Sequence, residues 1–162
     1  MKSVNIHASC VRLGGKGVLL LGKSGSGKSD LALRLIGRGA VLVADDRCDL
    51  FVERGRLTAR APQTIAGMLE VRGLGLVNIR HAARAPIALV VDLSAPVSRM
   101  PESGSYAPPK PLSLRQSAQP PLIALNAFET SVGDKIALAL GLLPDGRHRP
   151  AVKRRTAAVK RI

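Results

Sequence analysis

The sequence predicts a mixed α/β domain built around a central sheet, and three observations lead to this prediction. Continuous apolar runs such as Val18–Leu21 and Pro86–Leu93 are typical of strands that are buried on both faces. Segments with helical spacing of their apolar residues lie between and after these runs. The chain has 162 residues, which corresponds to one domain with a core of its own.

The predicted elements follow from periodicity and from turn residues. The loosely alternating segment Val4–Leu13 and the run Gly17–Gly22 flank a glycine-rich turn, which predicts a β-hairpin. Apolar spacing and the stop signals Gly37 and Gly39 predict a short helix over Lys28–Gly39. Further strands are expected at Ala40–Asp46, in a hairpin over Cys48–Arg60 centred on Arg54-Gly55, at Leu74–Ile79, Pro86–Leu93, Leu112–Gln116 and Pro121–Asn126.

The remaining segments predict helical turns and a loop. Pro62–Val71 is expected to hold one or two helical turns, and Thr130–Leu143 has helical spacing at Val132, Ile136, Leu140 and Leu143. Ser94–Pro111 is rich in Pro and Ser, which predicts a mobile loop. The sequence therefore divides into a domain over residues 1–145 and a basic, flexible tail over residues 146–162.

Composition narrows the function classes. The net charge is +14, which favours anionic partners such as nucleotides, acidic proteins or nucleic acid. Only two Phe, one Tyr and no Trp are present, so few side chains are available to stack on nucleic-acid bases. Cys10 and Cys48 lack metal-ligand spacing and are expected as buried or half-buried thiols in a reducing compartment. No apolar run is long enough to span a bilayer and no signal peptide is evident, so we expect a cytoplasmic protein without membrane contact.

A phosphate-binding motif carries the main functional signal. The stretch Gly22–Ser29 reads G-K-S-G-S-G-K-S and matches G-x-x-x-x-G-K-[ST], after a predicted strand and before a predicted helix. Its glycines allow backbone N–H groups to face phosphate oxygens, and the helix N-terminus adds positive charge. Lys28 is placed to reach the β- and γ-phosphates of a nucleotide, and Ser29 to bind Mg²⁺. The expected contact residues are Gly22, Lys23, Ser24, Gly25, Ser26, Gly27, Lys28 and Ser29.

Two aspartates end the strand predicted over Ala40–Asp46. Asp45 and Asp46 lie at the carboxyl end of a buried strand, where α/β sheets collect their ligands. Adjacent residues of an extended chain point to opposite sides, so the two carboxylates are expected to have different tasks. One suits Mg²⁺, and the other suits removal of a proton from an attacking hydroxyl.

Several segments together resemble bacterial HPr kinase/phosphorylase. The segments are Ile6–Ser9, the stretch Gly17–Gly39, Leu42–Arg47 and Leu69–Ile79, and the last of these contains the specific motif E-[VI]-R-G-x-G-[IL]. The resemblance is to the C-terminal catalytic domain of that family and covers most of residues 1–130. It implies a P-loop kinase domain with a fold like that of phosphoenolpyruvate carboxykinase, and commonly a homohexamer.

The resemblance also implies an activity. Such an enzyme uses ATP and Mg²⁺ to phosphorylate a serine of HPr, the small phosphocarrier of the phosphotransferase system. Family members also remove this phosphate by phosphorolysis, which consumes inorganic phosphate and releases pyrophosphate. In the family, the motif after the Pro-rich loop is roughly P-V-[RK]-x-G-R-N. Here the segment reads PLSLRQSAQPP, so it keeps Arg115 but lacks Gly-Arg-Asn, and the reverse reaction stays open.

The resemblance implies roles for individual residues. Lys28 is the P-loop lysine and Asp45 the base for phosphorylation, and His7 lies near the transferred group. Arg99 aligns with a catalytic arginine. The implied magnesium ligands are Ser29, Asp46 and Glu70, and Arg72 and Arg115 lie in functional segments.

Two other functions remain compatible with the residues. A small-molecule P-loop kinase would need a preformed substrate pocket, and an ATP-sensing regulatory module would bind nucleotide without turnover. The chain has no N-K-x-D motif, so a regulatory GTPase is not expected.

Overall fold

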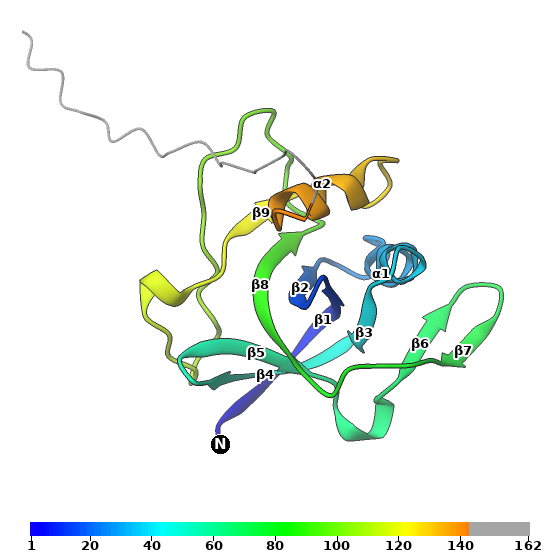
Figure 1. Ribbon diagram of the computed structural model, residues 1–162, viewed down its shortest axis with the longest axis horizontal. Helices are drawn as coiled ribbons and strands as arrows, with labels where there is room; N and C mark the ends of the chain where they lie inside the picture. The colour runs from blue at the N-terminus through cyan, green and yellow to red at the C-terminus, as the bar shows by residue number, and fades with distance from the viewer. Residues whose placement is uncertain (143–162) are drawn as a thin grey trace, which may run out of the picture.

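The computed structural model describes residues 1–142, and Figure 1 shows their arrangement. The predicted tail, the boundary at residue 145 and Leu143 lie outside the described residues. The elements are, in chain order, β1 (Ser3–Leu13), β2 (Lys16–Leu21), α1 (Lys28–Gly37), β3 (Val41–Ala44), β4 (Arg47–Glu53), β5 (Arg56–Arg60), the 3₁₀ helix η1 (Gln63–Ile65), β6 (Met68–Val71), β7 (Gly75–Asn78), β8 (Ala85–Asp92), the 3₁₀ helix η2 (Gln116–Ala118), β9 (Leu122–Ala124) and α2 (Val132–Ala139).

A mixed sheet with the strand order β3-β1-β2-β8-β9 forms the centre of the domain. β1 is antiparallel to both β2 and β3, whereas β2, β8 and β9 are mutually parallel. Four strands therefore run in one direction, and only β1 opposes them. Their carboxyl ends meet at one edge of the sheet, where open α/β sheets bind their ligands.

A second, antiparallel sheet shares two strands with the first. β4 pairs with the first half of β1, from Ser3 to His7, and β5 pairs with β4 and with the start of β8. The hairpin of β4 and β5 turns at Arg54 and Gly55, which both have positive φ, as a two-residue hairpin turn requires. Because β1 and β8 take part in both sheets, the two sheets form one continuous, folded surface.

Each face of the mixed sheet has its own apolar core. On one face, Leu20 packs with Leu31 and Leu35 of α1 and with Ile136 of α2. On the other face, Leu19 packs with residues of the second sheet, including Leu50 and Leu57. Successive side chains of a strand point to opposite faces, so β2 has consecutive apolar residues from Val18 to Leu21. The helices α1 and α2 lie over the same side of the strands (Figure 1).

Most predicted elements are confirmed. The opening hairpin, the short helix after the glycine-rich loop, the hairpin at Arg54-Gly55, the strand of Pro86–Leu93 and the final helix all form. One prediction needs correction. Leu112–Gln116 forms no strand: Leu112 and Leu114 pack into the second core instead. In Pro62–Val71 the expected helical turn forms as the 3₁₀ helix η1, and the segment then continues as strand β6, which the sequence did not predict.

A small hairpin and a long loop extend from this body. β6 and β7 pair only with each other, and Leu74 and Leu76 near their turn are 77% and 67% exposed. Figure 1 shows this hairpin projecting from the side of α1 and β3. Ser94–Pro111 contains no helix and no strand. Within residues 1–142 no helix has the length and apolar character needed to cross a bilayer.

Candidate active site at the carboxyl edge of the mixed sheet

The glycine-rich stretch Gly22–Ser29 joins β2 to α1, as its motif predicts. Gly27 caps the helix with φ 92°, a left-handed conformation that favours glycine. A Cβ at this position would lie 2.9 Å from the Cβ of Ala127. The first helical hydrogen bond runs from the N–H of Leu31 to the carbonyl of Gly27, at 2.9 Å. The loop therefore ends at a helix N-terminus whose free N–H groups can bind an anion.

The side chain of Lys28 lies across this loop. Its Nζ donates hydrogen bonds to the carbonyl oxygens of Gly22, at 2.6 Å, and Lys23, at 3.1 Å. Burial lowers the pKa of Lys28 from its ordinary value of 10.5, and the nearby Asp46 and Asp45 partly oppose this change. The ammonium group is thus held inside the loop, close to both carboxylates.

Asp45 connects three elements through its buried carboxylate. Its Oδ1 accepts hydrogen bonds from the hydroxyls of Ser29, at 2.7 Å, and Ser9, at 2.9 Å. Its Oδ2 accepts a bond of 3.1 Å from the backbone N–H of Glu70. These bonds tie the end of β3 to α1, β1 and β6. The serine of the phosphate motif and a carboxylate are therefore in direct contact.

Asp46 contacts a different residue of β1, the strand that also contains Ser9. Its Oδ1 lies 2.6 Å from Nε2 of His7, and both side chains are partly exposed to solvent. His7 and Ser9 lie two residues apart on β1 and so share one face of that strand. The expectation that the two aspartates point to opposite sides is therefore wrong. Asp46 has φ 67°, so the chain is not extended there, and this kink turns both carboxylates toward β1.

Glu70 reaches this cluster through its backbone. It lies on β6, its side chain is exposed, and only its N–H group contacts Asp45. Among residues 1–142, no three carboxylate, imidazole or thiol groups are close enough to form a metal site by themselves. The predicted magnesium ligands Ser29, Asp46 and Glu70 include a hydroxyl, so this observation does not test them and they stay a prediction.

The end of β8 supplies contacts that the sequence analysis missed. The hydroxyl of Ser94 accepts a hydrogen bond of 2.8 Å from the backbone N–H of Lys23. Asp92 Oδ1 in turn accepts bonds from the N–H groups of Ser94, at 2.9 Å, and Ala95, at 3.0 Å. The strand that runs parallel to β2 thus holds the first turn of the phosphate loop.

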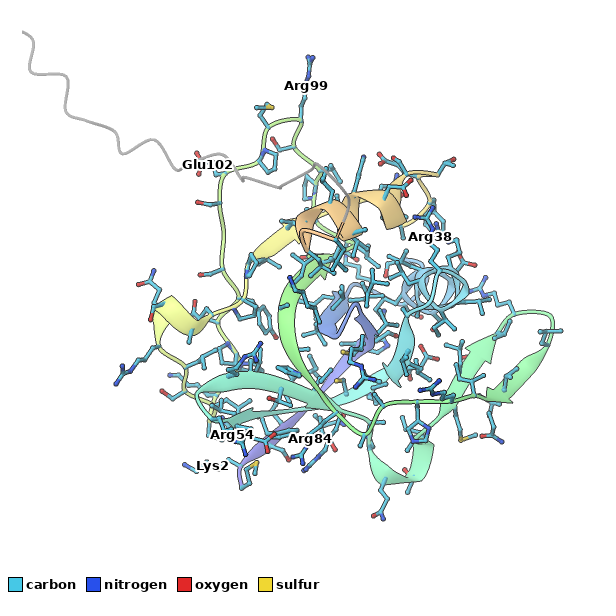
Figure 2. All side chains as sticks on the ribbon, in the orientation of Figure 1. Lys2, Arg38, Arg54, Arg84, Arg99 and Glu102 are labelled. Atoms are coloured by element: carbon cyan, nitrogen blue, oxygen red, sulfur yellow. The ribbon has the colours of Figure 1, made fainter. Side chains whose placement is uncertain are left out.

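Three predicted arginines lie at exposed positions outside this cluster. Arg72 lies in the turn of the β6–β7 hairpin, and Arg115 precedes η2. Arg99 lies at the outer end of the long loop, and its side chain points away from the body of the molecule (Figure 2). Their predicted roles stay untested predictions.

Ser9 is a further residue that sequence reasoning missed. It is fully buried and contacts both aspartates, because its hydroxyl donates to Asp45 and accepts from the N–H of Asp46 at 3.2 Å. A signal was available, since strand alternation places Ser9 on the same face as His7. No simple pattern predicts the role of Ser94, which depends on the pairing of β8 with β2.

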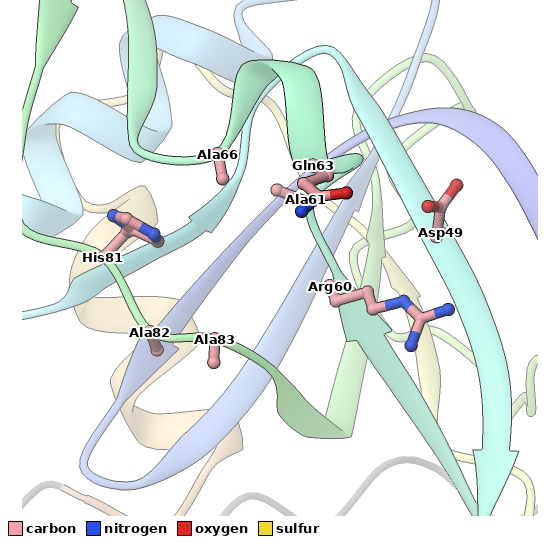
Figure 3. A pocket seen from close by; sticks show the side chains of 8 residues that line it. All are labelled: Asp49, Arg60, Ala61, Gln63, Ala66, His81, Ala82 and Ala83. Carbon is pink, nitrogen blue, oxygen red and sulfur yellow. The ribbon is translucent and has the colours of Figure 1, made fainter.

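A pocket of about 440 Å³ lies apart from this cluster. Figure 3 shows its lining side chains, which come from β4, β5, η1 and the segment before β8. The predicted site residues do not line it. Its lining residues are Asp49, Arg60, Ala61, Gln63, Ala66, His81, Ala82 and Ala83.

Comparison with curated proteins gives one consistent description. The chain is 51% identical over 75 residues to HPr kinase/phosphorylase of Leptothrix cholodnii, which covers 46% of the chain and 23% of that protein. It is 47% identical over 74 residues to the protein of the same name from Clostridium beijerinckii, covering 46% of the chain and 24% of that protein. With the Lactobacillus acidophilus protein it shares 38% identity over 100 residues, covering 57% of the chain and 31% of the relative. The chain thus spans less than a third of the length of these relatives.

A solved structure and a protein family also match the chain. The structure of the Hpr(Ser) kinase/phosphatase from Coxiella burnetii superimposes with a TM-score of 0.66 at 22% identity, covering 86% of this chain and 93% of that one. This match confirms the fold over most of the chain. The family described as HPr Serine kinase C-terminal domain matches residues 1–95, which include the phosphate loop, both aspartates and Glu70. The chain belongs to the HPr serine kinase C-terminal domain family.

Proposed function

We propose that this domain transfers the γ-phosphoryl group of ATP to a serine hydroxyl of an HPr-type phosphocarrier protein. The observation that carries this proposal is the pair of contacts Ser29–Asp45 and His7–Asp46 beside the phosphate loop. One carboxylate touches the predicted metal-binding hydroxyl, and the other is exposed beside a histidine. Phosphoryl transfer to a hydroxyl needs a positive group that neutralises charge on the phosphate oxygens and a base that accepts the hydroxyl proton.

The phosphate loop fits a nucleotide triphosphate. Among residues 1–142, the hydroxyl of Ser26 is the buried side-chain polar atom without a hydrogen-bond partner. It lies inside the loop, where a Cβ at Gly22 would come within 2.3 Å of it. Lys28 supplies a positive charge at the same place. The loop therefore offers donors whose chemistry matches phosphate oxygens.

Mg²⁺ fits the edge of the sheet beside this loop. Ser29 and a carboxylate in contact with it are oxygen ligands of the kind that Mg²⁺ prefers. When bound, Mg²⁺ neutralises charge that develops on the phosphate oxygens. Ser29 and Asp45 would hold it, and the exposed carboxylate of Glu70 is the further candidate.

The two aspartates would then divide the remaining work. Asp45 is buried and already accepts three hydrogen bonds, so it is poorly placed to receive a proton from an incoming hydroxyl. Asp46 is exposed and has one oxygen on His7, so its second oxygen can receive that proton. We therefore assign the metal side to Asp45 and the base to Asp46. The family resemblance implies the reverse assignment, and substitution of each residue decides between them.

In the proposed reaction, the bonds and charges balance without a further reactant. The serine oxygen of the acceptor forms a bond to the γ-phosphorus, and the bond from this phosphorus to the β,γ-bridging oxygen breaks. The serine proton goes to Asp46, ADP leaves, and the phosphoryl group stays on the serine. Lys28 holds the β- and γ-phosphates during the transfer.

The names of the relatives and the net charge of the chain support the proposed acceptor. The curated relatives are named HPr kinase/phosphorylase, which supports an HPr-type carrier as the acceptor here. The net charge of +14 would favour approach of an acidic partner. The segment around Arg115 lacks the Gly-Arg-Asn of the family motif, so we propose that phosphorylation exceeds phosphorolysis in this chain.

The test is incubation of the purified protein with ATP, Mg²⁺ and HPr, with phosphoserine identified by mass spectrometry. We expect serine phosphorylation in the wild type and none in Lys28→Met, with Leu33→Ala as a control for a substitution elsewhere on α1. ATP binding without any transfer to HPr would favour the regulatory module. Transfer to a small hydroxyl compound but not to HPr would favour the small-molecule kinase. A second incubation of phosphorylated HPr with inorganic phosphate measures the reverse reaction.

A further inference from the structure

We propose that Phe128 is the stacking surface for the nucleobase of the bound nucleotide, an inference that rests on the proposed use of ATP. Aromatic residues are rare in this chain, which has two Phe, one Tyr and no Trp. Phe51 is fully buried, whereas Phe128 is 69% exposed. Phe128 is therefore an exposed aromatic ring in a chain with few aromatic residues, and it lies beside the phosphate loop.

The ring of Phe128 lies against the phosphate loop. A Cβ at Gly27 would lie 3.2 Å from two carbons of this ring, Cε1 and Cζ. Gly27 is the last residue of the loop before α1. A triphosphate held by Gly22–Ser29 leaves its ribose and base outside the loop, so a ring on the rim of the loop is within reach of the base.

The chain around Phe128 is held firmly in place. The backbone N–H of Phe128 donates a bond of 2.9 Å to Oδ1 of Asn126, which forms a local turn. Arg34 of α1 donates a hydrogen bond to the carbonyl of Ala127. Ala127 itself is 1% exposed and belongs to the core on the helix side. The exposed ring therefore projects from an anchored turn, so little conformational freedom is lost when a flat ligand stacks on it.

The chemistry of this surface suits a base face and not a base edge. A phenyl ring offers no hydrogen-bonding groups, so it binds any planar base without reading its edges. This agrees with the absence of N-K-x-D, the guanine-reading motif, from the sequence. We therefore expect the domain to bind nucleotides more tightly than inorganic polyphosphates, and to bind adenine and guanine nucleotides with similar affinity.

Phe128→Trp provides a direct test. Because the chain has no Trp, the introduced indole is the only source of tryptophan fluorescence. We expect ATP and GTP to change this fluorescence saturably and inorganic tripolyphosphate to leave it unchanged while still binding. Equal responses to ATP and tripolyphosphate would overturn the proposal.

Phe128→Ala provides the matching affinity test. We expect its dissociation constant for ATP to rise about tenfold, in the range for loss of one base–aromatic stack, and that for tripolyphosphate to stay unchanged. Leu33→Ala, which removes an exposed apolar side chain of α1, should change neither value. Equal weakening of ATP and tripolyphosphate, or a change only in the KM for HPr, would overturn the proposal.

These readouts separate this inference from the proposed function. If the wild type binds ATP more tightly than tripolyphosphate through Phe128 but never phosphorylates HPr, the stacking role stands and the proposed acceptor falls. If HPr is phosphorylated and Phe128→Ala binds ATP as the wild type does, the stacking role falls and the proposed function stands. If the wild type binds no ATP, both fall.

Discussion

The hydroxyl of Ser29 donates a 2.7 Å hydrogen bond to Oδ1 of Asp45 and thereby joins the start of α1 to the end of β3. Ser9 and the backbone of Glu70 complete the surroundings of the same carboxylate. A buried carboxylate that satisfies donors from three other elements has a structural task in addition to any chemical one. The carboxylate of its neighbour Asp46 is exposed, and within residues 1–142 its hydrogen-bond partner is His7.

Asp45→Asn should lower the free energy of unfolding by about 1–3 kcal/mol, because an NH₂ group, which cannot accept a hydrogen bond, replaces one of the two carboxylate oxygens that accept from the N–H and hydroxyl donors. Asp45 is buried, so water does not replace the lost acceptor. Urea unfolding followed by circular dichroism measures the change. Ser9→Ala, which removes one of the donors to Asp45, is the matched control and should lower the free energy of unfolding by a smaller amount. An unchanged unfolding midpoint in Asp45→Asn would contradict the network described here.

Asp46→Asn should leave stability nearly unchanged and slow phosphoryl transfer. The pair with His7 is partly exposed, and such pairs contribute at most about 1 kcal/mol. Loss of a general base lowers the rate by about 100-fold or more, whereas the dissociation constant for ATP should stay the same. Single-turnover transfer to HPr and ATP binding are measured on the same preparation. Normal transfer by Asp46→Asn combined with abolished transfer by Asp45→Asn would return the role of base to Asp45.

Both cysteine thiols should be unreactive in the folded protein. Burial raises the pKa of Cys48 from 9.0 to about 12 and that of Cys10 well above 9.0, so almost no thiolate exists near pH 8. Titration with a thiol reagent should detect no reactive group in the native protein and both in urea. Rapid reaction of either thiol without denaturant would contradict the burial of both side chains.

The raised pKa of Cys48 also predicts how the free energy of unfolding changes with pH. Above pH 9.0 the unfolded chain loses its thiol protons, while the native chain keeps them until a pH near 12 for Cys48. The unfolded state then binds fewer protons than the native state, so the contribution of Cys48 to the free energy of unfolding falls as pH rises through this window. Cys48→Ser should reduce this alkaline loss, which unfolding curves at several pH values measure.

Nucleotide affinity should fall at alkaline pH because binding needs the ammonium form of Lys28. Burial lowers the pKa of Lys28 below 10.5, so the loss begins at a lower pH than for an ordinary lysine. The phosphates are fully ionised above about pH 8, which leaves the protein as the source of the change. Lys28→Arg stays charged throughout and is the control. Equal pH profiles for both proteins would contradict this role of Lys28.

The lowered pKa of Lys28 should make the free energy of unfolding rise with pH, whereas nucleotide affinity falls. Between its lowered pKa and 10.5, the unfolded chain binds a proton on Lys28 that the native chain lacks. The contribution of Lys28 to the free energy of unfolding therefore rises with pH in this window. Lys28→Met should remove this rise, and the two opposite trends separate binding from folding effects.

Local sequence patterns determined much of this protein. Apolar runs, glycine turns and the motif over Gly22–Ser29 each depend on neighbouring residues, so they predict β2, α1, β3 and the β4–β5 hairpin correctly. They also predict that a phosphate loop and two aspartates lie at one edge of a sheet. These features follow from backbone sterics, strand alternation and capping, which act over a few residues.

Only the tertiary structure decided how those pieces meet. Leu112–Gln116 has the composition of a strand but finds no partner strand, so it packs its leucines without a ladder. The kink at Asp46 turns the two aspartates toward one face of β1 instead of two. Ser9, Ser94 and Phe128 gained their positions from pairing and packing with segments 36, 71 and 101 residues away. Such contacts depend on the free energy of the whole folded chain, and no short window of sequence contains that information.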